Sequence, residues 1–89
     1  MSRRWRLVVT PQAERDLNRL PEKAVAAILE ALVAIQDDPI RLGKPLRGEL
    51  EGVLSARRGP YRILYRLARS SGAIHVIAIG HRADVYRRR

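Results

Sequence analysis

The spacing of apolar residues changes once along this chain, and that change limits the folds open to it. Between residues 11 and 37 apolar side chains recur every three or four positions, which is the period of a helix packed on a core. From residue 53 to residue 79 they form short runs bounded by Gly, Pro and Ser, as strands do. Helices followed by strands predict an α+β fold in which helices cover one face of a sheet.

Two helices are expected in the first half, after a strand at residues 4–9. Thr10 is a good N-cap and Pro11 suits the first helical position, so the first helix begins there and ends before Pro21. The second begins at Glu22 and ends at the Asp37-Asp38-Pro39 sequence. Its predicted buried face consists of Val25, Ile28, Leu29, Leu32 and Ile35.

The second half predicts a loop and an antiparallel meander of three strands. Residues 39–52 contain two prolines and three glycines and are expected to form the loop. Strands are expected at 53–58, 61–67 and 73–79, with turns between them. The full prediction is the order β-α-α-β-β-β. A two-helix hairpin packs on one face of a small antiparallel sheet, arginines line the other face, and a polar tail follows Gly80.

Length and composition predict a single domain over residues 1–89. A chain of 89 residues buries roughly 60% of its unfolded surface, and an apolar share of 46% is enough for a modest packed core. Cysteine is absent, which excludes disulfides and thiolate metal sites and fits a reducing cytoplasm. The first apolar run is too short for a signal peptide or a membrane span. We therefore expect a cytoplasmic protein without a membrane partner.

Positive charge is concentrated in the last 33 residues. They contain nine arginines and one acid, Asp84, whereas the first 56 residues hold nine basic and eight acidic side chains. Arginine outnumbers lysine sixteen to two, and its planar fork suits bidentate contacts to phosphate. This end of the molecule is predicted to face a phosphate backbone, with Arg87 to Arg89 as a basic tail that adds electrostatic steering.

Familiar catalytic and metal-binding signatures are missing. The sequence has no Gly-rich phosphate loop and no evident Ser, His and Asp arrangement. His75 and His81 lie about 20 Å apart along an extended chain, too far to share a metal. We expect neither a metal nor a cofactor.

A set of arginines with one histidine and one tyrosine can still cleave RNA. Ribose supplies its own nucleophile, the 2′-hydroxyl, so the protein need only align it, stabilise the charge on phosphorus and move two protons. Arginines stabilise the charge. His81 is the side chain whose ordinary pKa lies nearest neutrality, and Tyr86 is a second candidate for proton transfer. DNA lacks that hydroxyl and is excluded as a substrate.

Four segments together resemble a known family. They are TPQAERDLNRLP at the first helix, PLRG in the loop, SARRGPYRILYR in the hairpin and IAIGHRADVYR at the end, in the order found in the RelE branch of the RelE/ParE toxin superfamily. The resemblance covers essentially the whole chain. It implies a RelE-like fold and a toxin that cleaves mRNA in the ribosomal A site and inhibits translation. It also implies an acidic, RelB-like antitoxin that covers or distorts the basic face.

The resemblance assigns roles to four residues. Arg62 and Arg82 match the arginines that such toxins use at the scissile phosphate. Tyr86 matches a tyrosine that stacks on a base or assists proton transfer, and Arg47 matches an arginine that contacts nucleic acid. The predicted catalytic residues are therefore Arg62, Arg82, Tyr86 and His81, and the predicted RNA-binding residues are Arg47, Arg57, Arg58 and Arg66.

One departure from the family pattern concerns proton transfer. Where the enterobacterial RelE toxin has a pair of lysines before the hairpin turn, this chain has Val53 and Ser55. Neither can donate a proton as an ammonium does, and a guanidinium is not a general base because its pKa lies above about 12. The general acid and base are left open, which increases the interest of His81.

Two other functions fit the same sequence. The superfamily includes ParE-like proteins that inhibit DNA gyrase by binding, without cleaving RNA. An inactive toxin that acts as a co-repressor with its antitoxin is the other alternative. The HRADVYR ending favours the RNA-cleaving branch, since a gyrase inhibitor has no need of that pairing of arginine and tyrosine.

Overall fold

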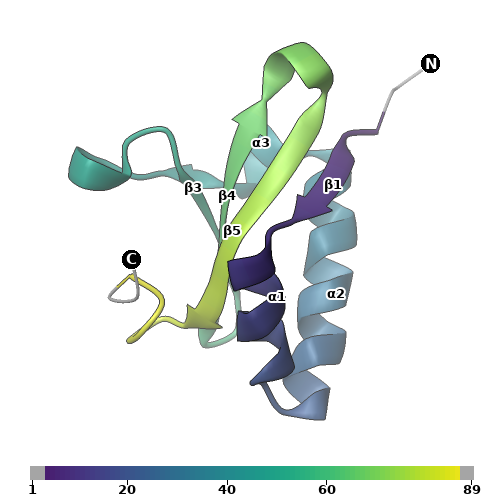
Figure 1. Ribbon diagram of the computed structural model, residues 1–89, viewed down its shortest axis with the longest axis vertical. Coiled ribbons are helices and arrows are strands. Elements are labelled where there is room, and N and C mark those ends of the chain that lie inside the picture. The colour runs from purple at the N-terminus through teal and green to yellow at the C-terminus, as the bar shows by residue number, and fades with distance from the viewer. Residues whose placement is uncertain (1–3, 87–89) are drawn as a thin grey trace.

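One five-stranded sheet with two long helices against one face makes up the fold (Figure 1). The structure, a computed structural model, describes residues 4–86. The elements in chain order are β1 (Arg6–Val9), α1 (Pro11–Asn18), α2 (Glu22–Asp37), α3 (Pro39–Leu42), β2 (Lys44–Pro45), the 3-10 helix η1 (Gly48–Leu50), β3 (Leu54–Arg58), β4 (Tyr61–Ala68), the 3-10 helix η2 (Arg69–Ser71) and β5 (Ala73–His81).

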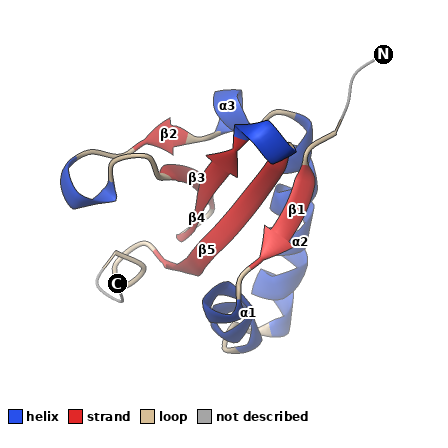
Figure 2. Ribbon diagram, turned by 45° about the horizontal axis from the view of Figure 1, so that its top comes forward, coloured by secondary structure: helices blue, strands red, loops and turns tan. Residues whose placement is uncertain are grey.

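The sheet is mixed rather than wholly antiparallel. Its strands lie in the order β1-β5-β4-β3-β2 (Figure 2), and the predicted meander of β3, β4 and β5 is antiparallel. β1 joins the other side of β5 in parallel, with Arg6 opposite Ala73 and Val9 opposite Val76. A parallel neighbour needs a long crossover, and the helices between β1 and the meander provide one. The α+β class and the element order are confirmed.

The helices begin and end close to the predicted residues. The Thr10 hydroxyl accepts a hydrogen bond from the Ala13 N–H (3.3 Å) and donates one to the Val76 carbonyl (2.8 Å). The N-cap therefore also fixes α1 to β5. α2 ends at Asp37, and Pro39 starts the short α3 instead of a loop.

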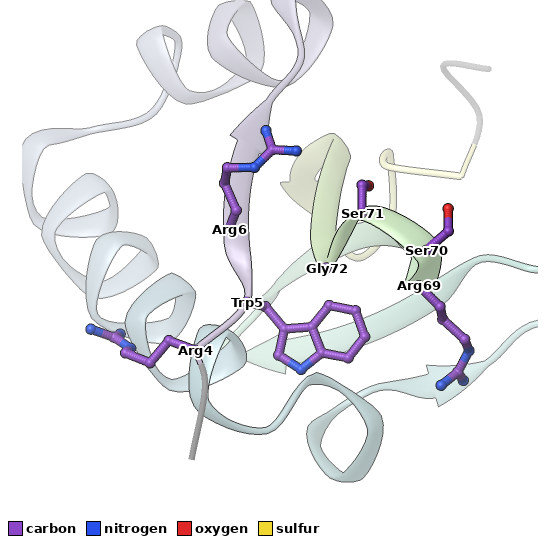
Figure 3. A pocket seen from close by; sticks show the side chains of 7 residues that line it. All are labelled: Arg4, Trp5, Arg6, Arg69, Ser70, Ser71 and Gly72. Carbon is purple, nitrogen blue, oxygen red and sulfur yellow. The ribbon is translucent and has the colours of Figure 1, made fainter. Parts of the chain in front are cut away.

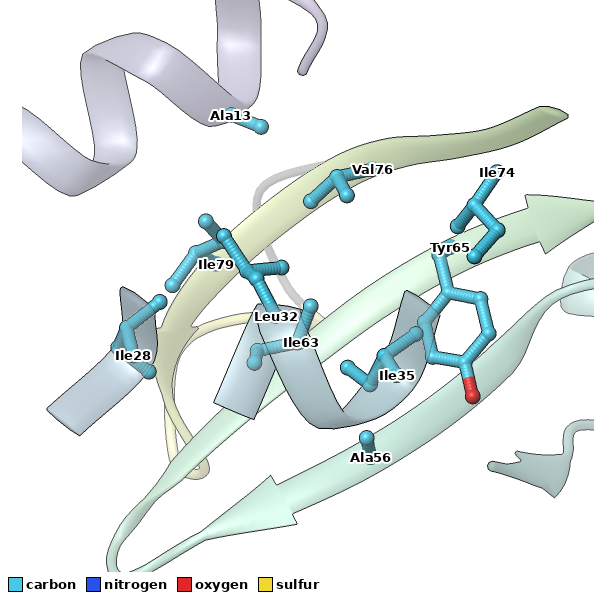
Figure 4. Packing of buried hydrophobic residues seen from close by; sticks show 10 residues of the cluster. All are labelled: Ala13, Ile28, Leu32, Ile35, Ala56, Ile63, Tyr65, Ile74, Val76 and Ile79. Carbon is cyan, nitrogen blue, oxygen red and sulfur yellow. The ribbon is translucent and has the colours of Figure 1, made fainter. Parts of the chain in front are cut away.

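The main core lies between α2 and the sheet (Figure 4). Its buried residues are Ala13, Ile28, Leu32, Ile35, Ala56, Ile63, Tyr65, Ile74, Val76 and Ile79. Ile28, Leu32 and Ile35 confirm the predicted buried face of α2, but Leu29 does not, because it is 49% exposed. Leu29 lies one position beyond the stripe that meets the sheet.

A second, smaller core lies on the opposite face, which we call the open face. It consists of Val53, Leu64, Ala78 and Val85, with Leu46 and Leu50 packed against it. Val85 belongs to the predicted polar tail, yet it is fully buried. The tail folds back because Leu64 and Ala78 would otherwise expose apolar surface on this face, where no long helix covers them.

Candidate active site

The register of the sheet places several polar side chains together on the open face. Arg57 of β3 lies opposite Arg62 of β4, and Ser55 lies opposite both Leu64 of β4 and Lys44 of β2. Residues paired across a ladder point to the same face. They border a cavity of about 450 Å³, which we call the open-face cavity, lined by Leu42, Lys44, Leu46, Ser55, Arg57, Arg62 and Tyr86.

Tyr86 reaches this cavity because the tail is anchored beside it. Val85 is fully buried in the open-face core, and its backbone N–H donates to the His81 carbonyl at 2.9 Å. The next residue, Tyr86, is 39% exposed, and its hydroxyl oxygen lies 3.1 Å from Ser55 Oγ. A ring held in this way leaves part of its surface free for a ligand.

The cavity carries three positive charges and no acidic lining residue. Lys44 and Arg57 are exposed, Arg62 is half-buried, and the ion pairs between residues 4 and 86 are Arg4–Asp37, Arg41–Asp38 and Arg58–Glu30. None of those pairs involves a cavity residue. Three like charges around one hollow attract an anion, and the guanidinium fork suits phosphate oxygens.

Two of the sequence-predicted residues lie on the helix side of the sheet instead. Arg58 places Nη2 2.6 Å from Glu30 Oε1 of α2. His81 pairs with Tyr61, whose ring it meets edge to face at a centroid distance of 6.1 Å. The His81 Nδ1 atom accepts a hydrogen bond from the Ala83 N–H at 3.2 Å. The structure therefore does not bring His81 into the open-face cavity with Arg62 and Tyr86.

The remaining predicted residues do not line the cavity. Arg82 follows β5 and is exposed, and its backbone N–H donates to the Pro60 carbonyl of the hairpin turn at 2.8 Å. Arg47 is exposed just before η1, and Arg66 is exposed further along β4, opposite His75. The predicted basic tail, Arg87 to Arg89, lies outside the described residues.

Lys44 is the cavity residue that sequence reasoning missed. It lies in the segment expected to be a loop, and its neighbour across the ladder is eleven positions away in the sequence. A two-residue strand carries no period that a sequence pattern can reveal. The adjacent glycine and proline are turn signals, and they indicate a loop where Lys44 in fact pairs with Ser55.

Asp16 is a second residue without a sequence signal, and its role is structural. It is 1% exposed in α1, and its Oδ2 atom accepts a hydrogen bond from the Ile79 N–H at 2.9 Å. Its Oδ1 atom accepts one from Gln12 Nε2, also at 2.9 Å. Asp16 thereby ties α1 to the end of β5, two residues before His81.

A hollow of similar size, about 470 Å³, lies at the other end of β4 (Figure 3). It is lined by Arg4, Trp5, Arg6, Arg69, Ser70, Ser71 and Gly72. One of its three guanidiniums is already engaged, because Arg4 Nε lies 2.9 Å from Asp37 Oδ1. The hollow holds no lysine, histidine or tyrosine. It can therefore attract an anion, but it lacks the proton-transferring groups of the open-face cavity.

Residues 4–86 contain no group of three or more His, Cys, Asp or Glu side chains placed to hold a metal ion. Within the same residues no helix has the length and apolar character needed to cross a bilayer.

Comparisons with known sequences find a toxin family and two toxin relatives. The sequence profile of a family described as "ParE toxin of type II toxin-antitoxin system, parDE" matches residues 7–86. Toxin RelG of Mycobacterium tuberculosis is 48% identical over 80 residues, which cover 89% of this chain and 92% of the relative. Toxin RelE of the same organism is 44% identical over 84 residues, which cover 93% and 87%.

Solved structures give the same result for the fold. A chain of the RelBE2 toxin–antitoxin complex from Mycobacterium tuberculosis superposes with a TM-score of 0.84 at 41% identity, covering 89% of this chain and 99% of that one. A chain of the intact RelBE complex from E. coli superposes with a TM-score of 0.74 at 21% identity, covering 86% and 95%. At that lower identity the likeness concerns the fold alone.

Proposed function

Since the chain belongs to the ParE toxin family and is a toxin of RelE type, one half of a toxin–antitoxin pair, we propose that it is a ribosome-dependent endoribonuclease. It acts in the cytoplasm, cleaves mRNA in the A site and thereby inhibits translation. The observation that carries this proposal is the open-face cavity, where Lys44, Arg57 and Arg62 meet the Ser55–Tyr86 pair.

The proposed reaction uses the substrate's own nucleophile. The 2′-hydroxyl oxygen of one ribose attacks the neighbouring phosphorus, the O2′–P bond forms and the P–O5′ bond breaks. The products are a 2′,3′-cyclic phosphate and a 5′-hydroxyl. Because the ribose supplies the nucleophile, the protein has to align the phosphate, stabilise its added negative charge and move two protons.

The cavity residues fit these tasks. The Arg62 and Arg57 guanidiniums neutralise the developing charge on the phosphate oxygens through charge-assisted hydrogen bonds. Tyr86 offers a partly exposed ring on which a base can stack and a hydroxyl that orients the ribose or exchanges a proton. Arg82, at the hairpin turn, supplies a further guanidinium to the phosphate.

The arginines outside the cavity are proposed to hold the flanking RNA. Arg47 and Arg66 are exposed, and contacts to phosphates away from the reacting one set the register of a nucleic acid. Arg58 is not given this role, because Glu30 already neutralises it on the helix side.

The proposed partner in the resting cell is an acidic antitoxin. The chain carries a net charge of +9, and the open-face cavity is lined by cations without acids. A segment rich in Asp and Glu that folds on the toxin would cover this cavity and exclude RNA.

Induced expression followed by mapping of mRNA 5′ ends tests the function. We expect growth arrest and new cleavage sites within translated reading frames. The double variant Arg62→Ala, Arg82→Ala is expected to grow and to leave the mRNA intact, while the Arg58→Ala variant behaves like wild type. Equal toxicity and equal cleavage by the double variant and wild type would overturn the proposal.

The His81→Asn variant, tested in the same way, decides the predicted role of the histidine. Because His81 faces Tyr61 on the helix side, we expect cleavage to stay within a few-fold of wild type. A loss as large as that of the double variant would restore His81 as the acid or base.

The matching profile itself favours a second candidate function. It is named for ParE toxins, and the resemblance to the ParE-like branch of the superfamily implies inhibition of DNA gyrase by binding. Supercoiling assays run beside translation assays separate the two functions. Inhibited supercoiling with intact mRNA would support the gyrase inhibitor, and cleaved mRNA with normal supercoiling would support the endoribonuclease.

A further inference from the structure

Lys44 lines the open-face cavity, and neighbouring contacts fix the position of its backbone. It lies on β2, the last strand of the sheet, opposite Ser55, whose Oγ lies 3.1 Å from the Tyr86 hydroxyl. Lys44, Ser55 and Tyr86 therefore follow one another along one wall, with Arg57 and Arg62 nearby. The chain has one other lysine, Lys23, on the exposed surface of α2.

The backbone before Lys44 is fixed by a close approach that only glycine allows. A Cβ atom at Gly43 would lie 2.9 Å from Leu54 Cβ and closer still to the Tyr65 hydroxyl oxygen. Gly43 has an extended backbone, so space rather than an unusual φ angle demands the glycine. β2 therefore lies tightly against β3.

The preceding turn is fixed as well. The fully buried Tyr65 donates a 2.6 Å hydrogen bond from its hydroxyl to the Pro39 carbonyl at the start of α3. Asp38 caps α3 by accepting from the Arg41 N–H at 3.3 Å, and its contact with the Arg41 guanidinium lowers the pKa of the Asp38 carboxyl. α3 and Gly43 together set where Lys44 enters the cavity.

The chemistry of the cavity gives this lysine a distinct role. Cleavage leaves a 5′-oxygen that must gain a proton as the P–O5′ bond breaks. The cations that line the cavity are two guanidiniums and one ammonium, and a guanidinium does not give up its proton in proteins. An ammonium can give up a proton. The proton transfer leaves a neutral amine and so removes one of the three like charges in the open-face cavity.

We infer that Lys44 is the general acid that protonates the leaving 5′-oxygen, an inference that rests on the proposed endoribonuclease function. The Lys44 ammonium gives one proton to the 5′-oxygen and becomes a neutral amine. The 2′-hydroxyl loses its proton to water, and the amine takes one back from water. The protons balance, and no oxidant or further reactant is needed.

The Lys44→Arg variant tests this inference most sharply, because it keeps the charge and removes the transferable proton. We expect cleavage on programmed ribosomes to fall about 100-fold or more for both Lys44→Arg and Lys44→Met. Lys23→Met is the matched control and should cleave like wild type. Thermal unfolding of each variant checks that the fold is retained.

A substrate with sulfur in place of the bridging 5′-oxygen supplies the second readout. A thiolate leaves without being protonated, so the Lys44 variants should regain most of the wild-type rate on it, whereas Arg62→Ala should not. A variant damaged only in its structure would not be rescued in this way.

The outcomes separate the two proposals. Wild-type cleavage by Lys44→Arg, or no rescue of either Lys44 variant by the sulfur substrate, would overturn the role of Lys44 while leaving the endoribonuclease standing. Failure of the wild-type protein to cleave mRNA on the ribosome would overturn the proposed function and, with it, this role.

Discussion

Arg57 and Arg58 are neighbours in the sequence, yet they lie on opposite faces of β3. Arg58 is on the helix side, where Glu30 of α2 neutralises it at 2.6 Å. Arg57 is on the open face, lines the cavity and lies across the ladder from Arg62. On the helix side an acid of the same protein neutralises the guanidinium, whereas the open face gathers like charges that an anion can neutralise. Strand alternation, and not charge density along the sequence, decides which arginines can act together.

Substitutions of the adjacent residues Ile63 and Leu64 compare how much the two faces of the sheet contribute to stability. We expect them to have the largest effect on the free energy of unfolding. Both are fully buried, Ile63 in the main core and Leu64 in the smaller open-face core. We expect Ile63→Ala to lower the free energy of unfolding toward the upper end of about 2–5 kcal/mol and Leu64→Ala toward the lower end. The reason is that the tail over Leu64 can settle into the space left behind.

Chemical denaturation of both variants measures this difference. Leu64→Ala should also shift Tyr86 and so reduce cleavage by more than its loss of stability explains. An equal loss of stability at the two positions would show that the open face has a full core of its own.

Asp16 offers the next largest effect, on the helix side. Replacing it with Ala removes a buried acceptor of the Ile79 N–H, and the free energy of unfolding should fall by about 1–3 kcal/mol. Cleavage by the folded variant should be unchanged, because α1 packs on the face away from the open-face cavity. Asp16→Asn keeps a carbonyl acceptor and should lose less; an unaltered melting temperature for Asp16→Ala would contradict this account.

The structure departs from the sequence prediction where contacts link distant residues. Thr10, Pro11 and the helix ends carry local signals, and they were predicted correctly. The pairing of Lys44 with Ser55 depends on Gly43 fitting under Tyr65, which no local pattern reveals. The burial of Val85 similarly depends on Leu64, 21 positions earlier in the sequence.

The candidate site was predictable in part. Arg57, Arg62 and Tyr86 were expected to act together, and the structure brings them to one cavity. Arg58 was grouped with them by its charge and His81 by its ordinary pKa near neutrality, but each alternates with a residue of the other face. The alternation that separates them is present in the sequence. What the sequence lacks is the partner of each residue, Glu30 for the arginine and Tyr61 for the histidine.

Tyr65, on the helix side, predicts a pH dependence of the free energy of unfolding. Burial raises the pKa of its hydroxyl from 10.0 to about 12. Because the pKa is higher in the folded than in the unfolded protein, the Tyr65 hydroxyl stabilises the fold. This stabilisation is fully present below pH 10 and is lost as the pH rises from 10 toward 12. Over that range the free energy of unfolding should fall by about 1–2 kcal/mol more in wild type than in Tyr65→Phe.

Unfolding curves of the two proteins at pH 9 and pH 11 measure this contribution. Tyr86→Phe, which removes a hydroxyl on the open face instead, is measured under the same conditions for comparison. Parallel pH profiles for wild type and Tyr65→Phe would mean that the buried hydroxyl does not titrate differently on unfolding.

Arg58 gives the smallest expected effect. Its side chain is 43% exposed and that of Glu30 is 72% exposed, so their ion pair contributes less than about 1 kcal/mol. Arg58→Ala should therefore melt within a few degrees of wild type. A double-mutant cycle with Glu30→Ala measures the coupling, and a value of several kcal/mol would show that the helix-side pair is a main support of the fold.

The rate of mRNA cleavage on programmed ribosomes, compared between Arg62→Ala and Arg58→Ala, tests the central claim most directly. Arg62 lines the open-face cavity and Arg58 lies on the helix side. We predict a fall of about 100- to 1000-fold for Arg62→Ala, the size expected when one stabilising donor is removed, and a rate near wild type for Arg58→Ala. Equal rates for the two variants, whether both high or both low, would contradict the division of the sheet into a structural face and a reactive one.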